Sequence, residues 1–271
     1  MNLEIKEISD KALEHRKTIL RIINKIGKGH VGGAFSCIDI LSSLYYGGIA
    51  NISLENFQKR NRNKIILSKG HSCISQYVIL EDIGLITKDD LYSMNSGGIL
   101  GEHPDPRIPG IDFISGSLGH GLGVAVGISL SSKLDELDNS TFVILGDGEC
   151  YEGSVWEAAI LASHLKLTNL IAIVDRNNLC IHGNTEEINS LEPFSEKWRS
   201  FGWNVIEIDG HNISEIVSSL KKRHESMPTA IIANTVKGKG VSFMENQSSW
   251  HHGSIDNYIL ESSLKELGCV E

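Results

Sequence analysis

Two polar residues thirty positions apart give the strongest chemical signal in this chain. Asp147 lies in a Gly-Asp-Gly turn after the apolar run 142–145, and Asn177 follows a second apolar run at 170–174. If both runs are buried strands of an open α/β sheet, the two side chains reach its carboxyl edge, where such sheets bind ligands. A carboxylate, an amide oxygen and a nearby backbone carbonyl form an all-oxygen set, which favours Mg²⁺ or Ca²⁺ over Zn²⁺.

The glycines that flank Asp147 favour a phosphate group in the same place. Glycine allows a backbone to approach an anion closely. The helix predicted over 153–166 would turn its positive N-terminal end toward the same anion. The sequence therefore predicts a diphosphate held through a hard divalent cation. The alternative is an ordinary βαβ unit with a conventional turn at 146–148.

Several of the eleven histidines lie within two residues of a glycine in segments predicted as loops at this edge. They are His30, His71, His103, His120, His251 and His252. Imidazole has a pKa near neutrality and moves protons on hydroxyl and carbonyl groups. Taken singly, each histidine is better explained as solvated or structural, but their repeated pairing with glycine indicates a site.

The elements that would position these residues alternate between strands and helices. Strands are predicted at 64–68, 113–115, 142–146, 170–174, 204–208 and 230–235. Helices are predicted at 3–26, 36–46 with Ser36 as N-cap, from about 72 to Glu81, opening in the small-residue run 116–132, and at 153–166, 194–201, 213–225 and 256–267. This alternation predicts an α/β fold with a doubly wound, mostly parallel sheet and helices on both faces.

Composition bounds the class of protein. The chain has 271 residues, 41% of them apolar and 22% charged, as in globular proteins, and we expect one domain over 1–271. A net charge of −9 argues against nonspecific nucleic-acid binding. A charged N-terminus and the lack of a long apolar run argue against secretion and membrane insertion. Five cysteines without CxxC spacing argue against a zinc cluster or disulfides and are typical of the cytoplasm.

The motifs together resemble the transketolase family. The Gly-Asp-Gly turn followed by Asn177 and Asn178 is similar to the thiamine diphosphate signature. GHVGGAFSCIDIL, LSKGH, GEHPDPRIPGIDFISGSLGHGLGVAVG and TVKGKGVSFMENQSSWHHG are similar to further family segments in the same order. The chain departs from the family pattern at Val31, where proline is usual, and at His120, where many relatives have glutamine. The resemblance implies thiamine diphosphate and Mg²⁺ as cofactors, with Ca²⁺ or Mn²⁺ as substitutes.

The resemblance also implies roles for residues around the cofactor. Asp147, the Asn177 side chain and the backbone carbonyl of Leu179 would ligate the metal. The residues implied to bind the cofactor are His71 and Gly148 at the diphosphate, Gly116, Ser117 and Leu118 at the aminopyrimidine, and also Asn177 and His252. Glu152 matches a carboxylate that lies at the subunit interface and couples paired active sites, although a glutamate at a helix N-terminus is also favoured by the helix dipole.

Three histidines carry the implied catalysis. His30 and His252 would contact the reacting hydroxyl or oxyanion and take the acid and base roles, and His103 would orient the donor hydroxyls. His251 competes with His252 for its role; His252 is preferred because it directly precedes Gly253, as in the family pattern.

The resemblance further implies a partner chain. In this family a separate pyrimidine-binding domain carries the glutamate that activates the cofactor, and that domain is not encoded between the WHHG segment and Glu271. We therefore expect the N-terminal subunit of a split transketolase, assembled with two of each chain. It would transfer a two-carbon ketol unit from a ketose to an aldose, either of them free or phosphorylated.

Other functions stay open at this point. One group keeps the cofactor: a deoxyxylulose-phosphate-synthase-like enzyme, a specialised sugar ketol or acyl transferase, or the α subunit of a 2-oxoacid dehydrogenase. Another class is a non-catalytic subunit that binds cofactor. A third is a protein that binds a transition metal through its histidines, but their wide spacing leaves the Gly-Asp-Gly signature unexplained.

Overall fold

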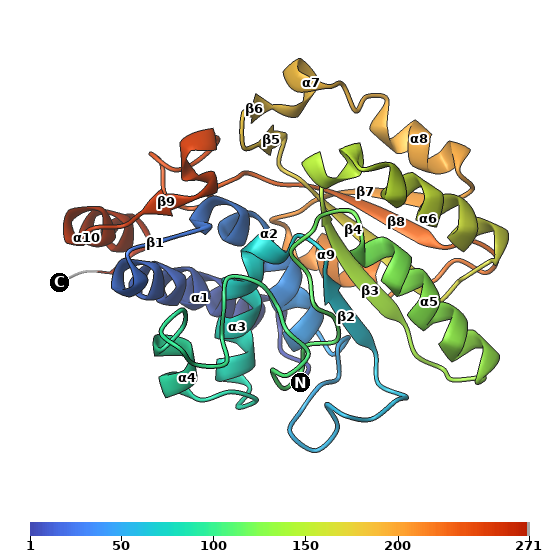
Figure 1. The fold of residues 1–271 in the computed structure, drawn as a ribbon, viewed down its shortest axis with the longest axis horizontal. Helices are drawn as coiled ribbons and strands as arrows, with labels where there is room; N and C mark the ends of the chain where they lie inside the picture. The colour runs from blue at the N-terminus through green and yellow to red at the C-terminus, as the bar shows by residue number, and fades with distance from the viewer. Residues whose placement is uncertain (270–271) are drawn as a thin grey trace.

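The centre of the protein is a five-stranded sheet in which every neighbouring pair is parallel. We describe residues 1–269 of a computed structural model (Figure 1). In spatial order the strands are β2 (Lys64–Leu67), β3 (Thr141–Gly146), β4 (Leu170–Arg176), β8 (Thr229–Asn234) and β7 (Asn204–Asp209). Strand β4 is buried along its whole length, because helices cover both faces of the sheet. The predicted parallel α/β fold is confirmed.

Alternate residues of each strand enter two separate cores. On β3, Phe142 and Ile144 pack into one core, whereas Val143 and Leu145 pack into the other. The first core lies under α1 (Ile5–Ile26), α2 (Val31–Tyr46), α3 (Cys73–Asp82) and α9 (Ile213–Leu220), and the second under α5 (Gly121–Leu134), α6 (Gly153–His164) and α8 (Phe194–Ser200). Figure 1 shows α5 and α6 across the sheet from α1, α2 and α3. Within residues 1–269, no helix combines the length and apolar character needed to cross a membrane.

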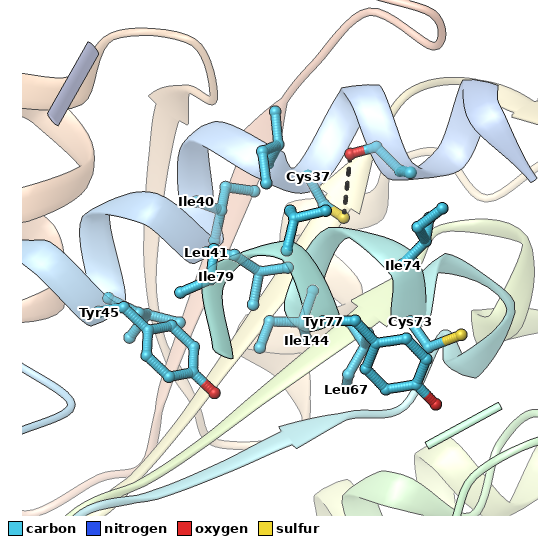
Figure 2. Packing of buried hydrophobic residues seen from close by; sticks show 14 of the residues in the cluster. Cys37, Ile40, Leu41, Tyr45, Leu67, Cys73, Ile74, Tyr77, Ile79 and Ile144 are labelled. Carbon is cyan, nitrogen blue, oxygen red and sulfur yellow. Dashed lines mark hydrogen bonds between the residues drawn. The ribbon is translucent and has the colours of Figure 1, made fainter. Parts of the chain in front are cut away.

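Helix α2 forms the middle of the first core. All of its sixteen residues are buried, and Cys37, Ile40 and Leu41 pack toward Ile79 of α3 and Ile144 of β3 (Figure 2). A helix that is mostly apolar around its circumference belongs in an interior. This burial fixes the N-terminal end of α2 beside the carboxyl edge of the sheet.

Most of the remaining elements are short. They are α4 (Lys88–Tyr92), α7 (Thr185–Ile188), α10 (Asn257–Glu266), the two-residue strand pairs β1 (Lys28–Gly29) with β9 (Gly253–Ser254) and β5 (Leu179–Cys180) with β6 (Gly183–Asn184), and the 3₁₀ turns η1 (Gly70–Ser72), η2 (Gly148–Tyr151) and η3 (Ser248–His251). The pairing of β1 with β9 brings the two histidine-bearing loops at 30 and 251–252 together.

Three predicted elements differ from the structure. The helix predicted from Ser36 begins at Val31, and Ser36 lies inside it, where its hydroxyl donates to Asp175 (2.6 Å). The early start is hidden in the sequence because Gly32 and Gly33 are poor helix formers. They are needed there, since a Cβ on Gly32 would lie 2.7 Å from the Trp250 carbonyl oxygen. The strand predicted at 113–115 is wrong, because that segment joins no ladder, and the helix predicted over 213–225 ends at Leu220.

Candidate active site

A cavity of about 440 Å³ opens at the carboxyl edge of the sheet. Its walls come from the ends of β3 and β4, the start of α2 and the loops that carry the histidines. Eight residues predicted for the site line it: His30, His71, Gly116, Leu118, Asp147, Gly148, Asn177 and Leu179. The strand register explains this convergence, because β3 and β4 are neighbours and Gly146 pairs with Asp175.

The three predicted metal-binding oxygens lie together in this cavity. Asp147 and Asn177 are almost fully buried. The Asn177 amide donates to Asp175 Oδ2 (3.2 Å), and its Oδ1 accepts from the Leu179 N–H (3.1 Å), so its orientation is fixed. The Leu179 carbonyl accepts from Lys237 Nζ (3.0 Å), so in this structure the oxygen contacts a cationic group. One carboxylate with two neutral oxygens suits a hard divalent ion such as Mg²⁺.

Asp147 is held by the surrounding backbone. Its Oδ1 accepts from the Gly148 N–H (2.8 Å) and its Oδ2 from the Asn178 N–H (2.6 Å). Burial and the neighbouring Asp175 carboxylate raise the pKa of Asp147 to about 6, so the group is ionised at neutral pH. The Gly148 N–H, predicted to meet a diphosphate, is donated to Asp147 in this structure. The N-terminal end of α6, which was predicted to face the same anion, is separated from Asp147 by the turn η2.

A buried ion pair under the cavity escaped the sequence reasoning. Lys69 and Asp175 are both fully buried, and the Lys69 ammonium contacts the Asp175 carboxylate and donates to the Gly33 carbonyl (3.0 Å). Asp175 also accepts from Ser36 and Thr235. Burial opposes its ionisation, but Lys69 holds the pKa of Asp175 below its usual value. These contacts join β2, β4, α2 and β8 beneath the site, and loss of one partner of such a pair is strongly destabilising.

Three imidazoles face one another across the cavity. The ring centroids of His30 and His71 lie 5.3 Å apart, those of His71 and His251 5.1 Å, and those of His30 and His251 5.4 Å. Burial, together with nearby cationic groups, lowers the pKa of His30 to about 4, of His251 to about 3 and of His71 well below 6.5. At neutral pH all three are therefore uncharged, and each has one acceptor nitrogen. On His251 that nitrogen is Nδ1, which accepts from Lys237 in this structure.

The other predicted site residues lie outside the cavity lining. His252 is exposed, and its ring centroid lies 4.5 Å from that of His30. His103 is exposed near Gly116, and its carbonyl accepts from Tyr77 (2.8 Å). Ser117 and Glu152 are also exposed. Of the two adjacent histidines, the structure places His251, and not the preferred His252, among the residues that line the cavity. His120 is exposed at the start of α5.

Lys237 and Glu149 also line the cavity and were not predicted. Lys237 is 2% exposed and contacts the Leu179 carbonyl and His251 Nδ1 (3.1 Å), neither of which carries a negative charge. Burial and Lys69 lower its pKa to about 8, so it remains mostly cationic and suits an anion. Glu149 accepts from the Gly119 N–H (2.9 Å) and the Gly146 N–H (3.0 Å), which ties two cavity loops together. Lys237 follows β8 as Asp147 follows β3, a signal that could have found it.

The histidines form no separate metal centre in the described part of the chain. Within residues 1–269, no group of three or more His, Cys, Asp or Glu side chains has a metal-ligating arrangement. The oxygen set around Asp147 is different in kind, since it combines one carboxylate with an amide and a backbone carbonyl. This gives no support to a histidine-based transition-metal protein.

Comparisons with known proteins agree with this geometry. Residues 10–269 match the family model described as the transketolase, thiamine diphosphate binding domain. The chain is 37% identical over 268 residues to one of the subunits of an apulose-4-phosphate transketolase of Phocaeicola vulgatus, covering 98% of this chain and 95% of the relative. It is 42% identical over 256 residues to a 6-deoxy-6-sulfo-D-fructose transketolase subunit of Clostridium sp., covering 93% of each.

Larger relatives contain this chain as one part. It is 31% identical over 267 residues to human transketolase, covering 97% of this chain but 42% of the relative. The crystal structure of a transketolase from Campylobacter jejuni superposes with a TM-score of 0.89 at 28% identity, covering 99% of this chain and 43% of that one. The chain thus spans less than half the length of these transketolases.

Fold and site define an α/β domain with a cavity at the carboxyl edge of a parallel sheet. Three oxygens that suit a hard cation, a buried lysine and three neutral imidazoles surround the same space. The chain belongs to the transketolase family of transferases and corresponds to its N-terminal, thiamine diphosphate-binding part.

Proposed function

We propose that this chain is the N-terminal subunit of a thiamine diphosphate- and Mg²⁺-dependent transketolase that transfers a two-carbon ketol unit from a ketose to an aldose. The observation that carries the proposal is the meeting of the Asp147, Asn177 and Leu179 oxygens with neutral histidines in one cavity. Relatives of the same length are named as subunits of transketolases, which supports the same assignment.

The metal and the diphosphate would be held by the ends of β3, β4 and β8. The side chains of Asp147 and Asn177 and the Leu179 carbonyl would ligate Mg²⁺, and Lys237 would move from that carbonyl to the diphosphate. The N–H of Gly148 would donate to the same anion. When bound, the cofactor supplies the electron sink for carbon–carbon cleavage. We assign the aminopyrimidine to Gly116, Ser117 and Leu118, of which Gly116 and Leu118 line the cavity.

Proton transfer would fall to the neutral imidazoles. His30 and His251 can each accept a proton from a substrate hydroxyl, because burial keeps them uncharged. The nearby cations Lys69 and Lys237 also favour release of that proton, so each imidazole can act in turn as base and acid. His103, exposed beside Gly116, would orient the donor hydroxyl at the mouth. His252 remains the alternative to His251, to be decided by substitution.

The partner would supply what completes the site. We propose a second chain that carries the pyrimidine-binding domain and the activating glutamate, in an assembly with two of each chain, acting in the cytoplasm without nucleic acid or membrane. Exposed apolar side chains on α5 and α6 support a covered face: Leu134 is 74% exposed, Ile160 54% and Leu161 47%. Glu152, exposed at the start of α6, would lie in that interface.

The test is ketol transfer with Mg²⁺ and thiamine diphosphate, by this chain alone and co-expressed with the chain encoded next to it. Xylulose 5-phosphate and ribose 5-phosphate serve as donor and acceptor. We expect activity only from the pair. Full activity of the isolated chain would overturn the split assembly, and absence of cofactor binding in both preparations would overturn the roles of Asp147 and Asn177. A pair that binds the cofactor but does not react with these sugars would leave the fold assignment standing and overturn the substrate assignment.

A further inference from the structure

A buried arginine at the end of β4 links the metal-binding carboxylate to one side of the cavity. Arg176 is 3% exposed. Its Nη1 lies 3.3 Å from Asp147 Oδ2 and donates to Thr185 Oγ1 (2.8 Å), while its Nη2 contacts Glu186 (2.7 Å) and Glu192 (3.1 Å). The planar guanidinium therefore contacts Asp147 through one nitrogen and the Glu186 and Glu192 carboxylates through the other.

The segment held by this arginine is the cavity wall, which we define as residues 179–193. It leaves the sheet after β4, forms β5, β6 and α7, and returns at α8, and Figure 1 shows it standing away from the sheet. Cys180, Ile181, His182 and Ile188 of the wall line the cavity. Ile181 is 60% exposed and Ile188 46%, so these side chains do little to fasten the wall to the core.

Polar contacts through Arg176 therefore hold much of the wall. Glu186, which pairs with Arg176, also accepts from the N–H groups of Leu191 (3.2 Å) and Glu192 (3.2 Å), so it organises the returning half of the wall. Outside this network, Tyr151 donates to the Thr185 carbonyl (2.7 Å), and the buried Leu191 anchors the far end. Movement of Arg176 would thus displace the whole segment.

We propose that Arg176 is a positioning residue that couples cation binding at Asp147 to the placement of the cavity wall. The inference rests on the proposed function, since it requires Asp147 to hold the cation. Three carboxylates share one guanidinium. A divalent cation bound to Asp147 would neutralise that carboxylate in place of Arg176. The guanidinium would then pair only with Glu186 and Glu192, and these stronger pairs would hold the wall more firmly. By thermodynamic reciprocity, a well-placed wall then strengthens cation binding.

The experiment uses the assembly of this chain with its partner chain. Hydrogen exchange of residues 179–193 is measured with and without Mg²⁺ plus thiamine diphosphate, and the Mg²⁺ concentration needed for half-maximal cofactor binding is measured by calorimetry. In the wild type, exchange of the wall should slow when the ligands are added. In Arg176→Met the wall should exchange rapidly in both states, and the Mg²⁺ requirement should rise about 10- to 100-fold, the usual cost of losing a group that orients a metal ligand.

Two further variants separate positioning from folding. Glu186→Gln keeps the link to Asp147 and weakens the wall, so it should speed exchange and, by the same reciprocity, raise the Mg²⁺ requirement only a few-fold. Arg199→Met removes an arginine that pairs with Glu196 and Glu207 and should change neither measurement. If Arg176→Met does not fold, Arg176→Lys keeps a charge but loses the fork, and it should show the loosened wall while β3 and β4 stay protected.

Each outcome decides the matter. Arg176→Met with a wild-type Mg²⁺ requirement overturns the inference, whether or not the wall loosens, and leaves the proposed function standing. A wild-type wall that exchanges equally with and without ligands also overturns it. A wild-type assembly that binds no thiamine diphosphate in Mg²⁺ overturns the inference and the proposed function together.

Discussion

Two cavities of similar size differ in the partners of their polar groups. The cavity at the carboxyl edge has a volume of about 440 Å³, and one beside α1 and α3 has about 560 Å³. Each contains a histidine whose pKa burial lowers to about 4, His30 in the first and His15 in the second. Volume and a perturbed histidine therefore do not distinguish them.

The difference lies in the partners of the polar groups. In the cavity beside α1, His15 contacts the Tyr46 hydroxyl (2.8 Å), which donates to Asp82 (2.7 Å), and Lys11 pairs with the same carboxylate (2.6 Å). In the carboxyl-edge cavity, Lys237 contacts only uncharged groups, and His30 has no side-chain hydrogen bond to any described residue. Polar groups that hydrogen-bond or pair with one another stabilise a fold. Polar groups in a cavity that lack such partners are typical of a ligand-binding site.

The largest expected effect contrasts a carboxylate from each cavity. Asp147→Asn should abolish Mg²⁺-dependent binding of thiamine diphosphate by the assembly, because it removes the only charged member of the oxygen set. Asp82→Asn should leave binding unchanged and lower the free energy of unfolding by about 1–3 kcal/mol, since it weakens hydrogen bonds to a charged group. Calorimetry and urea unfolding give the two measurements. Equal loss of cofactor binding in both variants would contradict the comparison.

The next effect separates two neighbouring histidines. His251→Ala should lower kcat by about 10²–10⁴-fold, the usual cost of losing a proton-transfer group, because His251 lines the cavity. His252→Ala, at an exposed position, should have a much smaller effect. Steady-state kinetics of the assembled enzyme provide the measurement. A larger loss of kcat in His252→Ala than in His251→Ala would assign the catalytic role to His252 and show that the partner rearranges the loop.

A smaller effect is expected from the buried lysine. Lys237→Met should weaken thiamine diphosphate binding about 10- to 100-fold, since hydrogen bonds to charged groups contribute roughly 1.5–3 kcal/mol. Binding of thiamine, which lacks the diphosphate, should change little and serves as the matched control. Equal losses for both ligands would show that Lys237 shapes the cavity and does not contact the anion.

The smallest effect concerns the pH dependence of stability. The pKa of His15 is about 4 in the folded protein against 6.5 for an exposed histidine. As the pH falls below 6.5, the unfolded chain takes up the proton first, so folding loses about 1 kcal/mol between pH 6.5 and 5.5. His15→Gln should remove this part of the pH dependence in urea unfolding, with cofactor binding at pH 7 unchanged. A slope identical to that of the wild type would contradict the role of burial at His15.

Local signals in the sequence were sufficient to predict that Asp147 and Asn177 lie close together. Asp147 and Asn177 each follow a continuous apolar run, and parallel strands bring their carboxyl ends to one edge. The same rule would have found Lys69 after β2 and Lys237 after β8. Local signals were not sufficient for the start of α2, because Gly32 and Gly33 lower helix propensity. These glycines are required by close contacts with Trp250 and His71, which lie far along the chain.

The sequence by itself determined the parallel α/β fold and predicted that the loops carrying Asp147, Asn177 and several histidines gather at one edge of the sheet. These depend on hydrophobic period and chain order, which local residues specify. Only the tertiary structure decided that Lys69 neutralises Asp175 across 106 positions, that Lys237 reaches Leu179 across 58, and that His251 lines the cavity while the adjacent His252 does not. Partners so distant in sequence, and the direction of a side chain at the end of a turn, are set by packing.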